Sequence, residues 1–418
     1  MSELFTNNLV WTGGAQTNWS GLLNIAKNAL GDAGRFADHR VLFVVDDNRQ
    51  ALAAVIYGLT NCLDWGVIER SRLTPEVEVR CYENGVWPVP IAGSATVTAP
   101  ATVDHVHGRI TVLTSGSTGL LKLIAHDRET LNTFDRMKQA DTQTWFLPFQ
   151  IGSYAWYQMV MLGLLVERQN LYAAETGDLA ASFERALATG QITAISSTPT
   201  FWRFVLLATD RDVLQVSPIN SISIGGEVVD QAILDQLRNI YPKAIIRHIY
   251  ASSETGAAIV VSDGLAGFPV RVLNDPQRKI GVKVEDGRLF IRSKYCTRTS
   301  GGDWVDTGDL IEIRNDRVYF CGRSGTTMIN VGGQKAFTHD VEAHLMSHPT
   351  VAWTKVTARK APLVGHLPIA AVVLKAPMEQ EQAEQMLVAH CTGKLADYAI
   401  PRLWQFLEGI PLSSSLKS

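Results

Sequence analysis

Short runs of β-branched and other apolar residues alternate with amphipathic stretches along most of this chain. The runs RVLFVV (Arg40–Val45), ITAISSTP (Ile192–Pro199) and AIIRHIYA (Ala244–Ala251) have the length and composition of buried strands. Amphipathic, helix-like stretches lie between such runs, as in LAASFERALATG (179–190) and VVDQAILDQLRNIYP (228–242). Because strands that alternate with helices usually pair in parallel, the pattern predicts an α/β fold of layered, partly parallel β-sheets with flanking helices.

The pattern changes toward the C-terminal part of the chain. After about Gly264, stretches such as GRLFIRS and DRVYF, separated by Gly and Asp, indicate shorter strands and hairpins. Beyond Gly322 the chain reads as strand, helix, strand and helix in MINVGG, HDVEAHLMSH, IAAVVLKA and EQEQAEQMLVAHCTGKL. We therefore predict a large N-terminal domain over residues 1–322 and a small C-terminal α+β domain over residues 323–418.

Composition and charge exclude several classes of protein. A formal net charge of -3 over 418 residues gives no bias toward nucleic acid or anionic membranes. The N-terminus lacks the basic start and apolar core of a secretory signal, and the most apolar segment, Met159–Val166, is too short to span a bilayer. The cysteines are odd in number, scattered and never spaced as CxxC, which predicts reduced thiols in a cytoplasmic protein and argues against structural zinc. They are Cys62, Cys81, Cys296, Cys321 and Cys391.

One loop has the composition of an anion-binding site. In ITVLTSGSTGLLKLIAH (Ile110–His126) a β-branched run enters a loop of Ser, Thr and Gly, and Lys122 follows. Glycines let backbone N–H groups converge and hydroxyls add donors, so the loop suits phosphate oxygens. It is not a P-loop, because neither Ser nor Thr follows Lys122 and the next residues read as a strand rather than a helix.

The loop resembles the phosphate loop of the adenylate-forming enzymes, which include acyl- and aryl-CoA ligases, adenylation domains and luciferases. It departs from that pattern at Leu121, where the family usually has Pro. Further segments resemble family motifs in the same order, so we identify the chain as a compact member of this superfamily. They are SIGGEVVD (223–230), IYASSETGA (249–257), WVDTGDL (304–310), the hinge region from Gly322 to Leu345, and the C-terminal YAIPRLWQFLEGIPLSSSLKS.

The resemblance implies a nucleotide site and assigns its residues. Glu254 would bind Mg²⁺ of the ATP complex, Ser253 would contact the α-phosphate and Tyr250 would stack on adenine. Asp309 would accept hydrogen bonds from the ribose hydroxyls, and Arg323 would reach the ribose or the phosphates. The phosphate loop would consist of Thr114, Ser115, Gly116, Ser117, Thr118, Gly119 and Lys122, with Thr118 and Lys122 acting in catalysis, and the adenine-side wall of Gly225, Gly226 and Glu227.

The same resemblance assigns roles to the C-terminal domain. Lys417 would be the catalytic lysine that bridges the substrate carboxylate and the α-phosphate, although Leu416 stands where the family prefers Gly. Gly325 would be the hinge about which the small domain turns between two half-reactions. Gly332 and Gly333 would line the thiol channel.

The acid pocket is predicted near PFQIGSYAWYQM, with Gln150 and Tyr154 lining it. Gln150 stands where the family often has His, and a neutral Gln cannot titrate near pH 7. The aromatic residues Phe149, Tyr154, Trp156 and Tyr157 could line the pocket or belong to the core. Fewer residues precede the phosphate loop than the family usually carries. This and the aromatic residues favour an aryl or short acyl acid.

Three histidines at near-helical spacing, His339, His344 and His348, could suggest a metal site. No Cys or carboxylate completes a ligand set around them, so a partly exposed helix face is the preferred interpretation.

The resemblance implies an AMP-forming acid–thiol ligase. It would activate a carboxylic acid with ATP and Mg²⁺, release pyrophosphate, and transfer the acyl group to CoA or to the phosphopantetheine of an acyl carrier protein. A medium- or long-chain fatty acyl ligase is the alternative within this class. A non-catalytic nucleotide-binding scaffold of the same fold is the alternative of another class. The oligomeric state cannot be inferred from the sequence.

Overall fold

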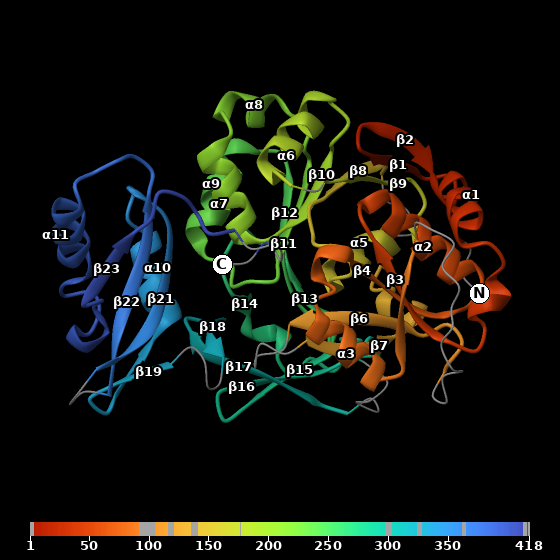
Figure 1. Ribbon diagram of the computed structural model, residues 1–418. Helices are drawn as coiled ribbons and strands as arrows, with labels where there is room; N and C mark the ends of the chain where they lie inside the picture. The colour runs from red at the N-terminus through yellow and green to blue at the C-terminus, as the bar shows by residue number, and fades with distance from the viewer. Residues whose placement is uncertain are drawn as a thin grey trace.

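The protein folds into four β-sheets with helices packed on and between them, as the computed structural model shows (Figure 1). The structure describes residues 4–91, 105–115, 121–134, 141–175, 177–296, 303–323, 328–361, 365–412 and 416. Three sheets form the large N-terminal part, and the fourth belongs to the small C-terminal part, drawn in blue.

The largest sheet is mostly parallel, in the order β13-β12-β11-β10-β8-β9-β1-β2. Only its edge pairs, β12 with β13 and β1 with β2, are antiparallel. The carboxyl ends of the parallel strands therefore share one edge, where α/β proteins usually bind ligands. The strands are β1 (Leu9–Thr12), β2 (Ala15–Asn18), β8 (Gln143–Leu147), β9 (Gln169–Ala173), β10 (Ala194–Ser197), β11 (Ser221–Gly225), β12 (Ile245–Ser252) and β13 (Gly256–Val261).

The second sheet has the order β5-β3-β4-β6-β7 and is parallel except for the β6–β7 hairpin. Strands of this sheet, strands of the first sheet and the apolar helices α2 (Asn48–Thr60) and α5 (Tyr154–Leu165) share one buried cluster, which joins the two sheets. The strands are β3 (Arg40–Val45), β4 (Asp64–Glu69), β5 (Val86–Pro90), β6 (Ile110–Ser115) and β7 (Leu121–His126).

The third sheet is antiparallel, in the order β14-β18-β17-β16-β15. Its strands are β14 (Phe268–Pro269), β15 (Gly281–Glu285), β16 (Arg288–Arg292), β17 (Val305–Arg314) and β18 (Arg317–Arg323).

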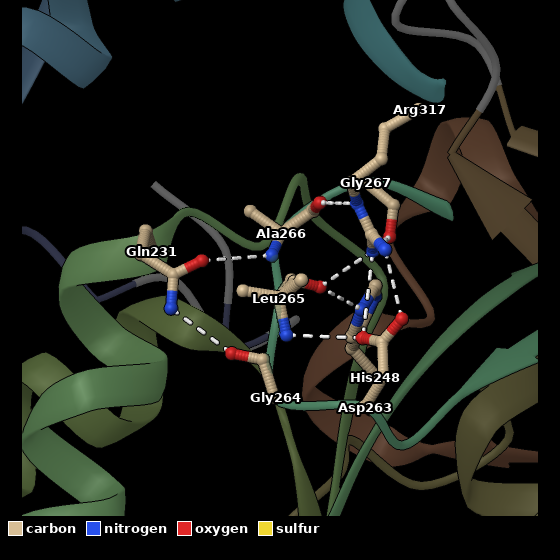
Figure 2. A network of polar contacts seen from close by, with 8 residues as sticks. All are labelled: Gln231, His248, Asp263, Gly264, Leu265, Ala266, Gly267 and Arg317. Atoms are coloured by element: carbon tan, nitrogen blue, oxygen red, sulfur yellow. Dashed lines mark hydrogen bonds and ion pairs between the residues drawn. The ribbon is translucent and has the colours of Figure 1, made fainter. Parts of the chain in front are cut away.

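A polar network fixes the loop that leads from β13 to this third sheet (Figure 2). Arg317 on β18 donates to the carbonyls of Leu265, Ala266 and Gly267 at 2.8–3.0 Å and pairs with Asp263 at 2.8 Å. From the other side, Gln231 at the start of α9 (Gln231–Ile240) donates to Gly264 O and accepts from Ala266 N, both at 2.9 Å. The first and third sheets are thereby tied to each other.

Replacing Arg317 by alanine should lower the stability of the large domain by about 2–3 kcal/mol, because several backbone carbonyls lose their donor together. Arg317→Lys should recover part of the loss, since an ammonium restores charge but not the planar set of donors. Thermal melting checks this, with exposed Arg211→Ala as the control. Equal melting temperatures of Arg317→Ala and wild type would refute it.

The small domain has one sheet in the order β20-β19-β22-β21, with β23 paired to β22. The predicted strands and helices are present, but the prediction missed three strands: β20 (Gln334–Phe337), the long β21 (Val351–Ala361) and β23 (Leu403–Phe406). Residues 324–327 lie outside the described residues, so the boundary at 322/323 stays a prediction. The other elements are β19 (Met328–Val331), α10 (Thr338–Met346), β22 (Gly365–Leu374) and α11 (Gln380–Cys391).

The predicted fold class, a large α/β domain followed by a small α+β domain, is confirmed. All five cysteines are free. None of the helices in the described part of the chain is both long and apolar enough to cross a membrane. The remaining helices are α1 (Trp19–Leu30), α3 (Pro75–Glu83), α4 (Arg128–Leu131), α6 (Leu179–Ala188), α7 (Pro199–Ala208) and α8 (Arg211–Val216), with 3-10 turns at Ala33–Phe36, Arg70–Arg72, Val270–Val272 and Asp397–Ala399.

Candidate nucleotide and acid site

The predicted adenine wall lies at the carboxyl end of β11. A side chain at Gly225 would put its Cβ 2.6 Å from the carbonyl oxygen of Ile249 on β12, and Gly226 has φ = 81°, so both positions require glycine. The Glu227 carboxylate accepts hydrogen bonds from the backbone N–H and the hydroxyl of Thr200, both at 3.0 Å. Glu227 therefore fixes this turn to the start of α7.

Three predicted nucleotide residues meet beside this wall. The Tyr250 hydroxyl donates to Asp309 Oδ2 at 2.5 Å, and Arg323 Nε lies 3.5 Å from Asp309 Oδ1. The Tyr250 ring stacks on Phe320, with centroids 4.9 Å apart. Burial raises the pKa of Asp309, while the Tyr250 hydroxyl and the Arg323 charge oppose that rise. The cluster joins β12 of the first sheet to β17 and β18 of the third, and its polar groups suit ribose hydroxyls.

The turn between β12 and β13 carries Ser253 and Glu254, both half-buried. The Ser253 hydroxyl donates to Glu254 Oε2 at 3.0 Å. Within the described ranges no three His, Cys, Asp or Glu side chains converge in a way that would hold a metal ion. A single carboxylate with a neighbouring hydroxyl fits Mg²⁺, because Mg²⁺ in nucleotide sites takes one or two carboxylates and completes its shell with phosphate oxygens and water.

The phosphate-loop residues sit on the β6–β7 hairpin. Thr114 and Lys122 are paired across the two strands, so they flank the loop. Ser115 ends β6. Gly116, Ser117, Thr118 and Gly119 lie outside the described residues, as do Gly325 and Lys417, and their roles stay predictions.

The four aromatic residues near the predicted acid pocket divide into two groups. Trp156 and Tyr157 are fully buried in the core of the large domain. Trp156 Nε1 donates to Asn48 Oδ1, and the Tyr157 hydroxyl accepts from Val67 N, each at 2.9 Å. Phe149 and Tyr154 are only partly buried and pack against the core clusters. Gln150, also half-buried, lies in the turn between β8 and α5.

The sequence-based prediction missed one buried polar residue near this pocket, His126 at the end of β7. Its ring contacts that of Tyr154, with centroids 5.6 Å apart, and its Nδ1 lies 3.2 Å from Thr130 Oγ1. His126 Nε2 and the Tyr154 hydroxyl are both buried, and neither forms a hydrogen bond of good geometry with a described residue. The Ser253 backbone lies close enough to the His126 ring to oppose the lowering of its pKa. The negative charge of Glu254 acts to raise the pKa of both side chains. In the sequence, His126 is recognisable only as a polar residue at the end of the apolar strand LKLIAH.

Acidification should destabilise the protein partly through His126. Burial lowers its pKa from 6.5 to about 4, so the folded state binds fewer protons than the unfolded state as pH falls below 6.5. The stability that His126 contributes is present above pH 6.5 and is lost as pH falls toward 4. This amounts to about 2 kcal/mol at pH 5.

Urea unfolding at pH 7.5 and 5.0, without nucleotide or metal, checks this. The stability lost between the two pH values should be smaller for His126→Asn, which cannot titrate, than for wild type. Equal losses would refute the assignment.

The remaining predicted residues lie on the small domain. Gly332 and Gly333 form the exposed turn of the β19–β20 hairpin, with φ = 58° and 89°. A thiol-channel role for them stays a prediction. His344 stacks on His390 of α11 and His348 meets the same ring edge-on, whereas His339 does not share this contact. Those two histidines therefore pack against α11, which the spacing along one helix could not indicate.

Both parts of the chain match models of one family. Residues 37–299 match the AMP-binding enzyme family, and residues 340–417 match the AMP-binding enzyme C-terminal domain. The chain therefore belongs to the AMP-binding enzyme family, and the predicted membership of the adenylate-forming superfamily is confirmed.

Relatives and solved structures agree with this assignment. The chain is 21% identical to 2-succinylbenzoate–CoA ligase from Bacillus licheniformis over 75% of this chain and 69% of that protein. It is 25% identical to the enzyme of the same name from Bacillus subtilis, over 64% of this chain and 56% of that protein. The chain thus spans between about half and two thirds of these relatives.

The fold is similar to that of the anthranilate CoA ligase AuaEII in complex with anthranoyl-AMP, with a TM-score of 0.74 at 18% identity, covering 99% of this chain and 93% of that one. It is also similar to that of o-succinylbenzoate CoA synthetase from Bacillus subtilis in complex with ATP and magnesium ion. The TM-score is 0.69 at 19% identity, and the match covers 98% of this chain and 95% of that one.

Proposed function

We propose that this protein uses ATP to activate an aryl or short acyl carboxylic acid, and then transfers the acyl group to a thiol. The observation that carries the proposal is that Tyr250, Asp309 and Arg323 lie together beside the predicted adenine wall, at the carboxyl edge of the largest sheet. The relatives support it, because their names specify CoA ligases of aryl acids.

The first half-reaction forms a bond between a carboxylate oxygen and the α-phosphorus of ATP while the bond to pyrophosphate breaks. Tyr250 offers its ring to adenine, and Asp309 accepts hydrogen bonds from the ribose. Glu254 would hold Mg²⁺, which supplies positive charge to the phosphates. Thr114, Lys122 and the loop between them would cradle the leaving pyrophosphate. Catalysis then rests on donors and charges that are already in position before the reaction.

The second half-reaction joins the sulfur of a thiol to the acyl carbon while AMP leaves. Lys417 is needed in the first half and must withdraw in the second, so the small domain would turn at Gly325. Gly332 and Gly333 would then line the thiol path. The names of the relatives favour CoA as the thiol, with a carrier-protein phosphopantetheine as the other candidate.

Acid-dependent ATP–pyrophosphate exchange, combined with hydroxamate trapping over aryl, short-chain and long-chain acids, tests the proposal. We expect exchange with aryl or short acyl acids, and thioester formation when CoA or a holo carrier protein is added. Preference for long-chain acids would favour a fatty acyl ligase. ATP binding without exchange for any acid would leave a nucleotide-binding scaffold.

A further inference from the structure

The residue before Lys417 is buried in the large domain. Leu416 is 2% exposed and belongs to the apolar cluster of the first sheet and its helices, together with Phe201 and Ile224. Its carbonyl oxygen accepts a hydrogen bond from the Thr198 hydroxyl. The chain thus returns from the small domain to the large one, where Leu412 packs against this cluster and Leu416 belongs to it.

The contact lies next to the candidate nucleotide site. Thr198 follows β10 at the carboxyl edge of the main sheet, and its hydroxyl also accepts from Phe201 N at 3.1 Å, which caps α7. Two residues further on, Thr200 donates two hydrogen bonds to the carboxylate of Glu227 in the predicted adenine wall. Leu416 is therefore held by the same helix start that orients this wall.

The backbone conformation at Leu416 is one that favours glycine, the residue that the family prefers at this position. Its φ is 60°, in the left-handed region that glycine adopts freely and leucine rarely does. A strained conformation of this kind persists only where its surroundings hold it. Here the buried side chain and the bonded carbonyl hold it, and Leu412 packs against the same cluster. The position keeps the glycine-like backbone and adds an apolar side chain.

We infer that Leu416 is an apolar anchor that fixes the C-terminal end of the chain on the large domain and thereby positions Lys417 for acid activation. The inference rests on the proposed function. Because Leu416 is bonded directly to Lys417, fixing its carbonyl and side chain restricts where the lysine can lie. Release of the anchor must precede the thiol step, so the anchor favours the first half-reaction over the second.

The test compares Leu416→Gly with Leu416→Met. Glycine keeps the backbone conformation and removes the anchor, whereas methionine keeps an apolar side chain of similar volume. We expect Leu416→Gly to lower kcat of acid-dependent exchange at least about tenfold, with KM for ATP nearly unchanged. Thioester formation from a supplied acyl-adenylate should not slow. Leu416→Met should stay close to wild type, as should Val216→Gly, a control at a position 83% exposed.

Two outcomes would overturn the inference. Full exchange activity in Leu416→Gly would show that only the backbone conformation matters. Equal slowing of both half-reactions would show a general structural role instead.

Hydrogen exchange of the C-terminal peptide gives a readout that does not depend on activity. Leu416→Gly should speed exchange over residues 407–418, and unchanged exchange would also refute the anchor. Absence of pyrophosphate exchange in the wild type would refute the proposed function alone and leave this readout standing.

Discussion

Replacing Lys417 by alanine is expected to lower acid-dependent ATP–pyrophosphate exchange by about 100-fold or more, because under the proposed function the attacking carboxylate and the α-phosphate lose the cation that bridges them. In the proposed second half-reaction this cation has no role. Thioester formation from a supplied acyl-adenylate should therefore continue at close to the wild-type rate. Measuring both half-reactions on one preparation of the variant checks the expectation.

The matched control is Lys394→Ala, which removes an exposed lysine from the same domain. It should leave both half-reactions unchanged. Equal loss of the two half-reactions in Lys417→Ala would remove the assigned role, since it would indicate damage to the fold or to a step common to both. Arginine at position 417 should not restore full activity, because its planar guanidinium presents its donors differently from an ammonium.

The layered fold could be predicted from the sequence because local patterns determine it. The run Arg40–Val45 forms β3 over those same residues, and the stretch 179–190 contains α6. The order of strands could not be predicted in this way. That β9 lies between β8 and β1 depends on packing between segments far apart in the sequence. Strand β21 was missed because its last third is exposed and basic, which hides the apolar pattern.

Sequence motifs predicted the candidate nucleotide residues. Residues whose role depends on how deeply they are buried could not be assigned from the sequence. Helix α5 is apolar on nearly every side, so periodicity could not separate its partly buried Tyr154 from core residues such as Trp156. His126 was missed because the burial of its ring nitrogen is visible only in three dimensions. The burial of Leu416 could not be predicted from the sequence, because it depends on a tertiary contact that outweighs an unfavourable backbone conformation.

Glu254 is proposed to bind Mg²⁺, and within the described residues it belongs to no group of three or more His, Cys, Asp or Glu side chains that could hold a metal ion. Its carboxylate would then supply negative charge to Mg²⁺ in addition to that of the phosphates. Glu254→Gln keeps the side-chain shape and an acceptor for the Ser253 hydroxyl, but removes that charge.

Exchange activity of Glu254→Gln should accordingly fall by about 100-fold at low Mg²⁺ and recover in part as Mg²⁺ is raised, because weaker coordination is offset by concentration. Titrating Mg²⁺ at fixed ATP measures this. The exposed Glu83→Gln provides the control and should follow the wild-type curve. If the Mg²⁺ dependence of Glu254→Gln matched that of the wild type while its activity fell, the carboxylate would act on something other than the metal. His126 and Tyr154, both within reach of its charge, would then be the groups to examine as its partners.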